Sequence, residues 1–256
     1  MSSPKISIVM PCFNAESTIS DSIESVLNQT FTKFELIISD DHSTDKSIEI
    51  IKQYNDPRIK LISNKKNKGA AGARNSALDI AQGSYITFLD SDDLWMPNKL
   101  KNQLVYMEKN NLLFSYGDYS ICDSNRKITG YMKSPNHISY KDLLKKCNIG
   151  CLTVMLHYSC ISGLRFPYRK KEDYCFWLNI LKKNNIIACN YLCNDAIYRK
   201  SGKSLSSNKI KEIYNQWVVL RCNDVNFISR IYFMATYILN GIVKHHIYYK
   251  KDKYYE

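Results

Sequence analysis

Hydrophobic residues in the first 110 positions form short continuous runs separated by stretches with helical spacing. The runs Ile6–Met10, Glu35–Ser39, Ile59–Ser63 and Tyr85–Leu89 predict four buried strands. Between these runs, apolar side chains recur every three or four positions, which is the spacing of an amphipathic helix. Strands that alternate with helices predict an α/β protein whose mostly parallel central sheet is flanked by helices.

Several helix ends can also be placed. Ser43 or Thr44 is a suitable N-cap for a helix that follows the second run. The alanine-rich segment Ala70–Gln82 is expected to be helical and to stop at Gly83. Pro97 suits the first turn of a further helix, because the first helical residue has no intrahelical partner for a backbone N–H.

The alternation weakens after position 110. The segments Tyr119–Cys122 and Lys127–Tyr131 predict a hairpin, and Cys151–Leu156 predicts another strand. Apolar residues in Glu172–Lys183 have helical spacing. From Ile210 onward the chain is expected to form a helical tail.

One face of this tail is apolar. The helical spacing places five side chains on a single stripe: Ile228, Ile231, Ala235, Leu239 and Ile242. The longest uncharged stretch, Ile231–Val243, has 13 residues, whereas a transmembrane helix needs about 20. Basic residues flank the stripe, so we expect the tail to rest on an anionic membrane surface. Packing on the rest of the chain or on a second subunit stays open as the alternative.

The charge of the chain is strongly basic. Its 36 Lys and Arg and 24 Asp and Glu residues give a formal net charge of +12, and residues 200–256 carry half of this excess. This balance favours anionic partners such as phosphorylated substrates or anionic lipid. No nucleic-acid-binding motif accompanies it, so nucleic acid is not expected as a partner. The scattered cysteines and the polar N-terminus predict a cytoplasmic location.

Acidic residues follow the fourth predicted strand directly. Asp90 and Asp92 are one residue apart at the carboxyl end of that strand, where ligands bind in parallel sheets. Two such carboxylates suit a hard cation, Mn²⁺ or Mg²⁺, together with phosphate oxygens. The alternative is an acidic turn that caps the helix near Pro97.

The other strand ends carry further polar and aromatic candidates. Asp41 is placed to accept from a base N–H or a ribose hydroxyl, and Phe13 to stack on a base. Arg74, in a segment of small residues, is suited to binding phosphate. For the pair Asp40-Asp41, and above all for Asp40, the alternative is capping of the next helix. For Phe13 it is packing in the core, and for Arg74 it is an exposed position on a helix.

An acidic pair opens the helix predicted after position 171. Asp173, with Glu172 beside it, is a candidate general base that takes a proton from an acceptor hydroxyl. The alternative is a favourable charge at a helix N-terminus. His157 is expected to be structural, and the basic, hydroxyl-rich loop after Tyr198 either grips phosphate or is solvated.

In combination these segments resemble the family 2 glycosyltransferases, which have the GT-A fold. The matching segments are ISIVMPCFN from Ile6, SVLNQTF from Ser25, FELIISDDHSTD from Phe34, GARNSA from Gly72, FLDSDDLW from Phe88 and EDYCFW from Glu172. The resemblance covers residues 5 to about 205 and extends to transferases of capsule, O-antigen and teichuronic acid synthesis. The sequence SLSSNK from Ser204 is also typical of that branch.

The resemblance implies a role for each matched position. Binding of the nucleotide-sugar is implied for Pro11, Phe13, Asn14, Glu16, Asp41, Arg74, Asp90 and Ser91. Asp90 and Asp92 would form the metal motif, with Asp92 as the direct ligand. Asp173 would be the base, with inversion at the anomeric carbon. His42 departs from the family pattern beside the nucleobase site.

The resemblance also implies a reaction and a domain layout. Membrane spans and the Gln-x-x-Arg-Trp motif of processive synthases are absent, so transfer of a single hexose-type sugar is expected. The donor would be a UDP-sugar, and the acceptor a surface-polysaccharide or lipid-linked glycan at the inner face of the plasma membrane. The expected layout is a catalytic domain over 1–205, divided near 110 into nucleotide-sugar and acceptor halves, and a basic helical tail over 206–256. Oligomers are compatible with this layout.

Two other function classes fit parts of the sequence. A sugar nucleotidyltransferase also uses a parallel sheet and acidic metal ligands, but its Gly-rich loop after the first strand is missing here. A non-catalytic polyanion-binding module fits the charge but predicts binding without turnover.

Overall fold

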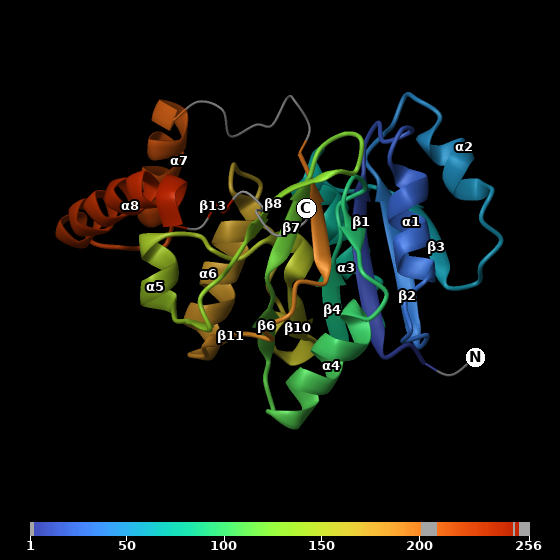
Figure 1. Cartoon of the computed structure of the whole chain (residues 1–256), viewed down its shortest axis with the longest axis horizontal. Helices are drawn as coiled ribbons and strands as arrows, with labels where there is room; N and C mark the ends of the chain where they lie inside the picture. Colours follow the sequence, from blue (N-terminus) through green and yellow to red (C-terminus); the bar gives the residue numbers. More distant parts are fainter. Residues whose placement is uncertain (1–2, 201–208, 248, 251–256) are drawn as a thin grey trace.

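The computed structural model describes residues 3–200, 209–247 and 249–250. Its central sheet has eight strands in the order β3-β2-β1-β4-β10-β6-β11-β9 (Figure 1). The strands are β1 Ile6–Cys12, β2 Phe34–Asp40, β3 Ile59–Ser63, β4 Tyr85–Phe88, β6 Phe114–Tyr116, β9 His137–Ile138, β10 Met155–His157 and β11 Ala188–Asn190. The strands β1 to β4 are parallel, whereas β10 runs antiparallel to both β4 and β6. The predicted α/β class is confirmed, with a sheet that becomes mixed after β4.

A second sheet lies beside the first and contains the predicted hairpin. Its five strands follow the order β13-β8-β7-β12-β5. They are β5 Leu94–Trp95, β7 Tyr119–Cys122, β8 Ile128–Met132, β12 Ala196–Arg199 and β13 Tyr249–Lys250. The strands β7 and β8 pair antiparallel as expected, and β5 brings the segment after the acidic turn against β12.

Helices cover both faces of the central sheet. These are α1 Ile19–Leu27, α3 Ala70–Leu78, α4 Lys99–Lys109 and α6 Glu172–Asn184, with the shorter α2 Ser47–Lys52 and α5 Tyr140–Lys145 beside them. The helices α7 Lys209–Cys222 and α8 Phe227–Ile247 lie at one end of the molecule, next to α5 (Figure 1). Alternate residues of β1 point to opposite faces, as the period of a strand requires. Ile8 and Met10 pack with α1 and α4, while Val9 packs in the core that includes α6. Because both faces are buried, the strand reads as one continuous apolar run.

Several local expectations about the ends of helices and strands need correction. The helix α3 ends at Leu78, four residues before Gln82, so Gly83 does not stop it. Gly83 instead lies against β1, where its N–H donates to Ser7 Oγ at 2.8 Å and an added Cβ would meet the Ser7 nitrogen at 2.5 Å. Pro97 precedes the N-cap residue of α4 rather than entering the first turn.

The predicted strand Cys151–Leu156 is only partly a strand. Its first residues form a 3₁₀ turn, Cys151–Thr153, and β10 begins at Met155. The Thr153 hydroxyl donates to the Gly150 carbonyl at 2.7 Å, a local bond that favours the turn over extension.

The tail is helical but broken into α7 and α8 near Asp224, which has a left-handed φ of 57°. The described members of the predicted stripe face outward: Ile228 is 81% exposed, Ile231 53% and Leu239 62%. The opposite face, with Met234, packs on the core. For these residues the structure excludes packing on their own chain. The side chain of Ile242, the boundary at residue 205 and the SLSSNK segment up to Asn208 lie outside what is described.

No helix within the described ranges is both long enough and apolar enough to cross a bilayer.

Candidate active site

The carboxyl ends of β1 and β2 meet at one edge of the sheet and bring Asp41 to a fixed position. Asp41 is buried, and its backbone N–H donates to the Cys12 carbonyl at 2.8 Å. Asn64 Nδ2 donates to one carboxylate oxygen at 2.6 Å, and the Gly69 N–H donates to the other at 2.7 Å. A carboxylate has about four acceptor positions, so Asp41 keeps capacity for a base or ribose. Its neighbour Asp40 accepts from the Ser43 N–H at 3.1 Å, but α2 begins at Ser47 with Lys46 as its N-cap residue, so neither Asp40 nor Ser43 caps that helix as expected.

Asn14 and Glu16 join two loops of this edge. The Asn14 side-chain oxygen accepts from the Thr44 N–H at 2.8 Å, and Glu16 accepts from the Lys46 N–H at 3.1 Å. Asn14 has a left-handed φ of 47°, which an asparagine tolerates better than most residues. Both side chains are therefore occupied in holding the loop after β1 against the loop after β2.

Phe13 is the aromatic residue of this edge that faces solvent. Its side chain is 49% exposed, and Lys68 Nζ lies 5.3 Å from the ring centroid. The core-packing alternative for Phe13 is wrong, because an exposed ring beside a cation is available for stacking on a flat ligand. Pro11, two residues earlier, is buried within β1.

The acidic turn after β4 places Asp90, Ser91 and Asp92 at partly exposed positions. Burial, and then the neighbouring Asp90 carboxylate, raise the pKa of Asp92. Two carboxylates one residue apart at the end of a strand can be shared by one cation, which would offset their repulsion. The adjacent Asp93 is different, since it is fully buried and accepts from the Arg199 N–H at 2.9 Å.

Arg74 connects this turn to the helix that carries the candidate base. Its guanidinium is buried and donates to Asp90 at 2.6 Å and to Glu172 at 2.9 Å. The exposed-helix alternative for Arg74 is therefore wrong. Phe166 lies under the guanidinium, 5.4 Å away at the ring centroid. One planar side chain thus holds Asp90 and Glu172, which lie 16 and 98 positions from Arg74 in the sequence.

Asp173 lies in the first turn of α6, next to this ionic contact. Burial and the adjacent Glu172 carboxylate raise the pKa of Asp173 to about 6, although Arg74 acts in the opposite direction. Its carboxylate also accepts from the Tyr174 N–H at 2.7 Å. A carboxylate with this pKa is ionised at neutral pH and is a stronger base than an ordinary aspartate.

The start of α6 is also fixed to the tail. Lys171 precedes the helix with a left-handed φ of 57°. Its ammonium lies 3.1 Å from the Glu212 carboxylate on α7 and 3.2 Å from the Tyr237 hydroxyl on α8. Gln216 on α7 donates to the Tyr174 hydroxyl at 2.9 Å. The tail therefore supports the helix turn that carries Asp173.

An ionic contact behind the acidic turn was not predicted from the sequence. Arg199 at the end of β12 donates to Asp21 on α1 at 2.9 Å, while its N–H holds Asp93. Arg199 is 178 positions from Asp21 and 106 positions from Asp93, so no local sequence pattern indicates these contacts. The only hint was the basic character of the loop after Tyr198, most of which lies outside the described residues.

A divalent metal fits the acidic turn with help from the substrate. In the described part of the chain, no group of three or more His, Cys, Asp or Glu side chains is placed to hold a metal ion. Asp90 and Asp92 supply two carboxylates, and the oxygen-rich phosphates of a donor would supply further ligands, as is usual for Mg²⁺.

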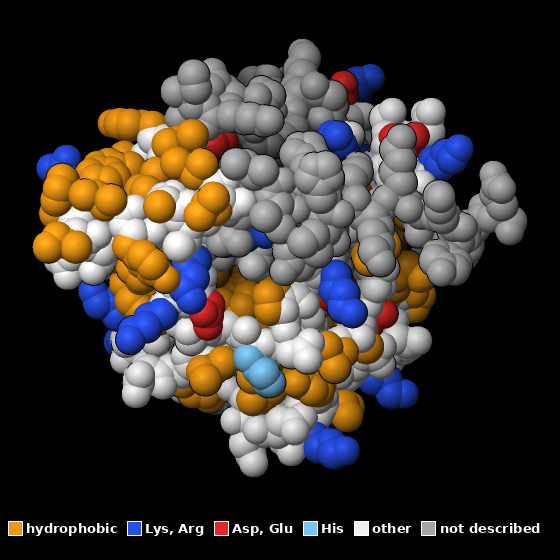
Figure 2. Space-filling view, turned by 60° about the vertical axis from the view of Figure 1, so that its left-hand side comes forward, with side chains coloured by type: hydrophobic (Ala, Val, Ile, Leu, Met, Phe, Trp, Pro, Cys, Tyr) orange, Lys and Arg blue, Asp and Glu red, His pale blue; other side chains and the backbone are white. Residues whose placement is uncertain are grey.

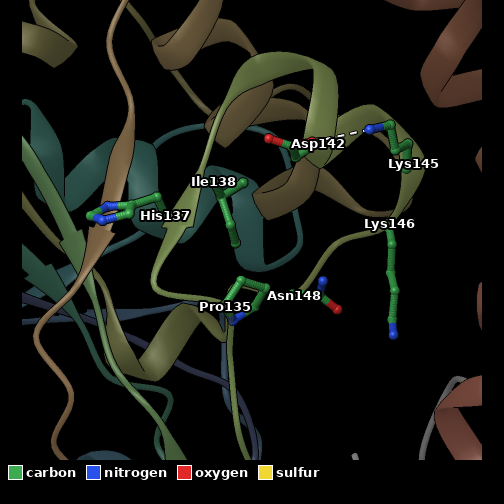
Figure 3. A pocket seen from close by; sticks show the side chains of 7 residues that line it. All are labelled: Pro135, His137, Ile138, Asp142, Lys145, Lys146 and Asn148. Carbon is green, nitrogen blue, oxygen red and sulfur yellow. Dashed lines mark hydrogen bonds and ion pairs between the residues drawn. The ribbon is translucent and has the colours of Figure 1, made fainter.

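A cavity of about 250 Å³ lies apart from this site, at the edge of the sheet beside α5 (Figure 3). Its lining includes His137, Ile138 and Asn148, and Asp142 pairs with Lys145 at 3.1 Å. Lys146 also lines the cavity, and none of the candidate site residues do.

Comparison with known proteins agrees with this geometry. A family model described as glycosyl transferase family 2 matches residues 7–171. An Escherichia coli relative is 49% identical over 97% of this chain and 98% of its own length. Its name is UDP-Glc:alpha-D-GlcNAc-diphosphoundecaprenol beta-1,3-glucosyltransferase WfgD.

Solved structures share the fold at low sequence identity. Staphylococcus aureus TarS 1–349 in complex with UDP-GlcNAc has a TM-score of 0.72 and 19% identity, and the match covers 94% of this chain and 74% of TarS. A Pyrobaculum calidifontis mannosyltransferase in complex with GDP-Man and Mn²⁺ has a TM-score of 0.62 and 14% identity, with 96% and 76% covered. The GT-A fold and the predicted family are thus confirmed, and the chain belongs to glycosyl transferase family 2 as a glycosyltransferase.

Proposed function

We propose that this enzyme transfers one glucose from UDP-glucose, with inversion, to a hydroxyl of an N-acetylglucosamine that is linked through a diphosphate to a polyprenol. The donor and acceptor are those in the name of the WfgD relative, which matches nearly the whole chain. The observation that carries the proposal is the buried Arg74, whose contacts hold Asp90 of the acidic turn and Glu172 beside Asp173.

The donor would bind across the carboxyl ends of β1, β2 and β4. In this proposal the exposed Phe13 ring stacks on the uracil, and the fixed Asp41 carboxylate accepts from the base or the ribose. Asp90 and Asp92 would hold Mn²⁺ or Mg²⁺, which when bound supplies positive charge against the diphosphate leaving group. Arg74 acts as a positioning residue, because its two terminal nitrogens already bind carboxylates.

Asp173 would remove the proton from the acceptor hydroxyl as the oxygen attacks the anomeric carbon. The new C–O bond forms on the face opposite the departing UDP, so an α-linked donor gives a β-linked product. The raised pKa of Asp173, about 6, fits this role, since the carboxylate is ionised at pH 7 yet basic. Glu172 cannot share the role while it pairs with Arg74.

The test is a donor and product assay on the full chain with Mn²⁺. UDP-glucose, UDP-N-acetylglucosamine and GDP-mannose are compared, with a short-chain, water-soluble N-acetylglucosamine-diphospholipid as acceptor. We expect UDP-glucose to be preferred and the new linkage to show the large anomeric proton coupling of a β-glucoside. Preference for UDP-N-acetylglucosamine or GDP-mannose, or an α-linked product, would contradict the proposal.

A further inference from the structure

The α7–α8 tail presents a broad apolar surface to solvent. On α8, the side chains of Phe227, Ile228, Ile231, Tyr232, Ile238 and Leu239 are each at least 43% exposed. Tyr214 on α7 adds a side chain that is 65% exposed. Figure 2 shows a wide hydrophobic area on the side of the molecule that carries these helices. We call these seven residues the tail patch.

The charges around the tail patch are mainly basic, and the exposed Asp224 before α8 is paired with Lys182. The sequence of α8 contains Arg230 and Lys244 but no Asp or Glu. The Arg230 guanidinium lies 5.1 Å from the Trp217 ring centroid and 5.6 Å from that of Phe227, so it stays at the margin of the patch. Arg221 is exposed on α7, and Figure 2 shows further Lys and Arg side chains bordering the hydrophobic area.

We propose that the tail patch lies on an anionic phospholipid surface and brings the active site to a lipid-linked acceptor. An apolar helix face with a basic margin, too short in its uncharged stretch to span, is the pattern of an interfacial helix. Exposed aromatic residues such as Phe227 and Tyr232 suit the headgroup region. This inference takes its lipid-linked acceptor from the proposed function. Binding of the tail patch to a lipid surface does not depend on that function.

A second copy of the chain is a less suitable occupant. In a twofold dimer the same patch meets itself, so the basic margins of the two copies would face each other. Arg221 and Arg230 of one copy would then approach those of the other, which makes that contact repulsive. An anionic lipid surface turns the same charges into attraction.

The connection to the catalytic centre is direct. The tail contacts the first turn of α6 through Lys171, whose ammonium touches both Glu212 on α7 and Tyr237 on α8. The outward face of α8 rests on lipid in this arrangement, while its inward face supports the turn that holds Asp173. The acceptor sugar, linked to a lipid in the same surface, is thereby kept near the base.

The test uses co-sedimentation of the full chain with vesicles of equal parts phosphatidylglycerol and phosphatidylcholine. The double variant Ile228→Glu/Ile231→Glu replaces two patch residues that are exposed and therefore not needed for the core. The matched control, Val105→Glu/Ile187→Glu, changes two side chains that are 56% and 54% exposed outside the patch. We expect the patch variant to bind at least tenfold more weakly than the parent, and the control to keep parental binding apart from a small charge effect.

Enzyme assays separate this proposal from the proposed function. With a water-soluble acceptor the patch variant should keep activity within about twofold of the parent, and with acceptor in vesicles it should lose most activity. Vesicle binding needs neither donor nor acceptor, so it succeeds or fails independently of the reaction. Parental vesicle binding by the patch variant would overturn the inference, and so would a parent dimer that the variant disperses.

Discussion

The two parts of the central sheet hold their acidic residues in different ways. At the ends of β1 and β2, Asp41 is surrounded by neutral donors, the Asn64 amide and the Gly69 N–H. Beyond β4, Asp90 and Glu172 are held by the charged Arg74, and Asp173 has a raised pKa. The first arrangement suits a fixed acceptor that recognises a ligand, and the second suits a carboxylate that exchanges a proton. Substitutions should therefore separate donor binding from transfer.

The largest effect is expected for Asp173→Asn. The amide keeps the shape and the contact with the Tyr174 N–H but cannot take a proton. Transfer to acceptor should fall by about three orders of magnitude or more, within the range for loss of a general base. UDP-glucose affinity by calorimetry should stay within about threefold, because the proposed donor contacts lie at the other strand ends. If the variant lost affinity for UDP-glucose but transferred at the parental rate, the assignment of donor binding and proton exchange to different parts of the sheet would be wrong.

The pH dependence checks the same residue. The pKa of Asp173 is raised to about 6, so transfer by the parent should fall as pH drops through about 6. Because the folded protein favours the neutral form of Asp173, protonation of this group contributes to the free energy of unfolding at low pH. That contribution is lost as the pH rises through about 6. The Asn variant should therefore gain about 1–2 kcal/mol relative to the parent above pH 6 but little at pH 4. An acid limb near pH 4 would contradict the raised pKa.

The next largest effect is expected for Asp92→Ala. Removing this carboxylate weakens the metal that offsets the leaving diphosphate, and turnover should fall by about two to three orders of magnitude. EDTA should inactivate the parent, and Mn²⁺ should restore it but not the variant. Asp56→Ala, which removes a surface carboxylate paired with Arg58, is the matched control and should keep activity. Full activity of Asp92→Ala after EDTA treatment would remove the metal role.

Replacement of Arg74 tests whether the two arrangements are connected. Arg74→Met keeps much of the buried volume but leaves Asp90 and Glu172 without their shared cation. We expect turnover to fall by about tenfold to a hundredfold, and unfolding free energy by about 2–3 kcal/mol, since both carboxylates are partly solvated. Denaturant unfolding measures the second quantity. Arg165→Met, which breaks the exposed pair with Asp79, should change both values little.

Much of the first part of the fold could be predicted from sequence because its signals are local. Each strand from β1 to β4 follows a mainly apolar run, and candidate site residues come directly after β1, β2 and β4. The hairpin of β7 and β8 and the helix α6 were also predictable from spacing. The role of Arg74 was not, because nothing in Gly72–Ser76 indicates partners 16 and 98 positions away.

The later part resisted prediction where tertiary contacts or single residues decide the structure. The tail reads as continuous helix, but the chain turns at Asp224, and β13 returns to pair with β8. Helical spacing identified the stripe on α8 but could not say which face packs, because both faces are apolar. Phe233 and Met234 face the core, while Ile228 and Ile231 face solvent.

Lys171→Met gives the smallest effect and sharpens the comparison most. Methionine keeps the aliphatic stem but removes the ammonium that reaches Glu212 on α7 and Tyr237 on α8. If the tail only shields the core, transfer should be unchanged. If it supports the first turn of α6, kcat with soluble acceptor should fall about threefold to tenfold with unchanged UDP-glucose affinity.

The control for this prediction is Lys182→Met. That lysine contacts Asp224 at 3.5 Å and belongs to the last turn of α6, far from Asp173 along the helix. Its loss should leave kcat at the parental value, while both variants lose only about 0.5–1 kcal/mol of stability. An equal kcat for Lys171→Met and Lys182→Met would assign the tail to membrane or core contacts alone. A selective loss at Lys171 would mean that the inward side of the two tail helices aligns the base, through the ammonium that reaches Glu212 and Tyr237. Together with vesicle binding through the tail patch, it would place surface binding and proton transfer on opposite sides of the same two helices.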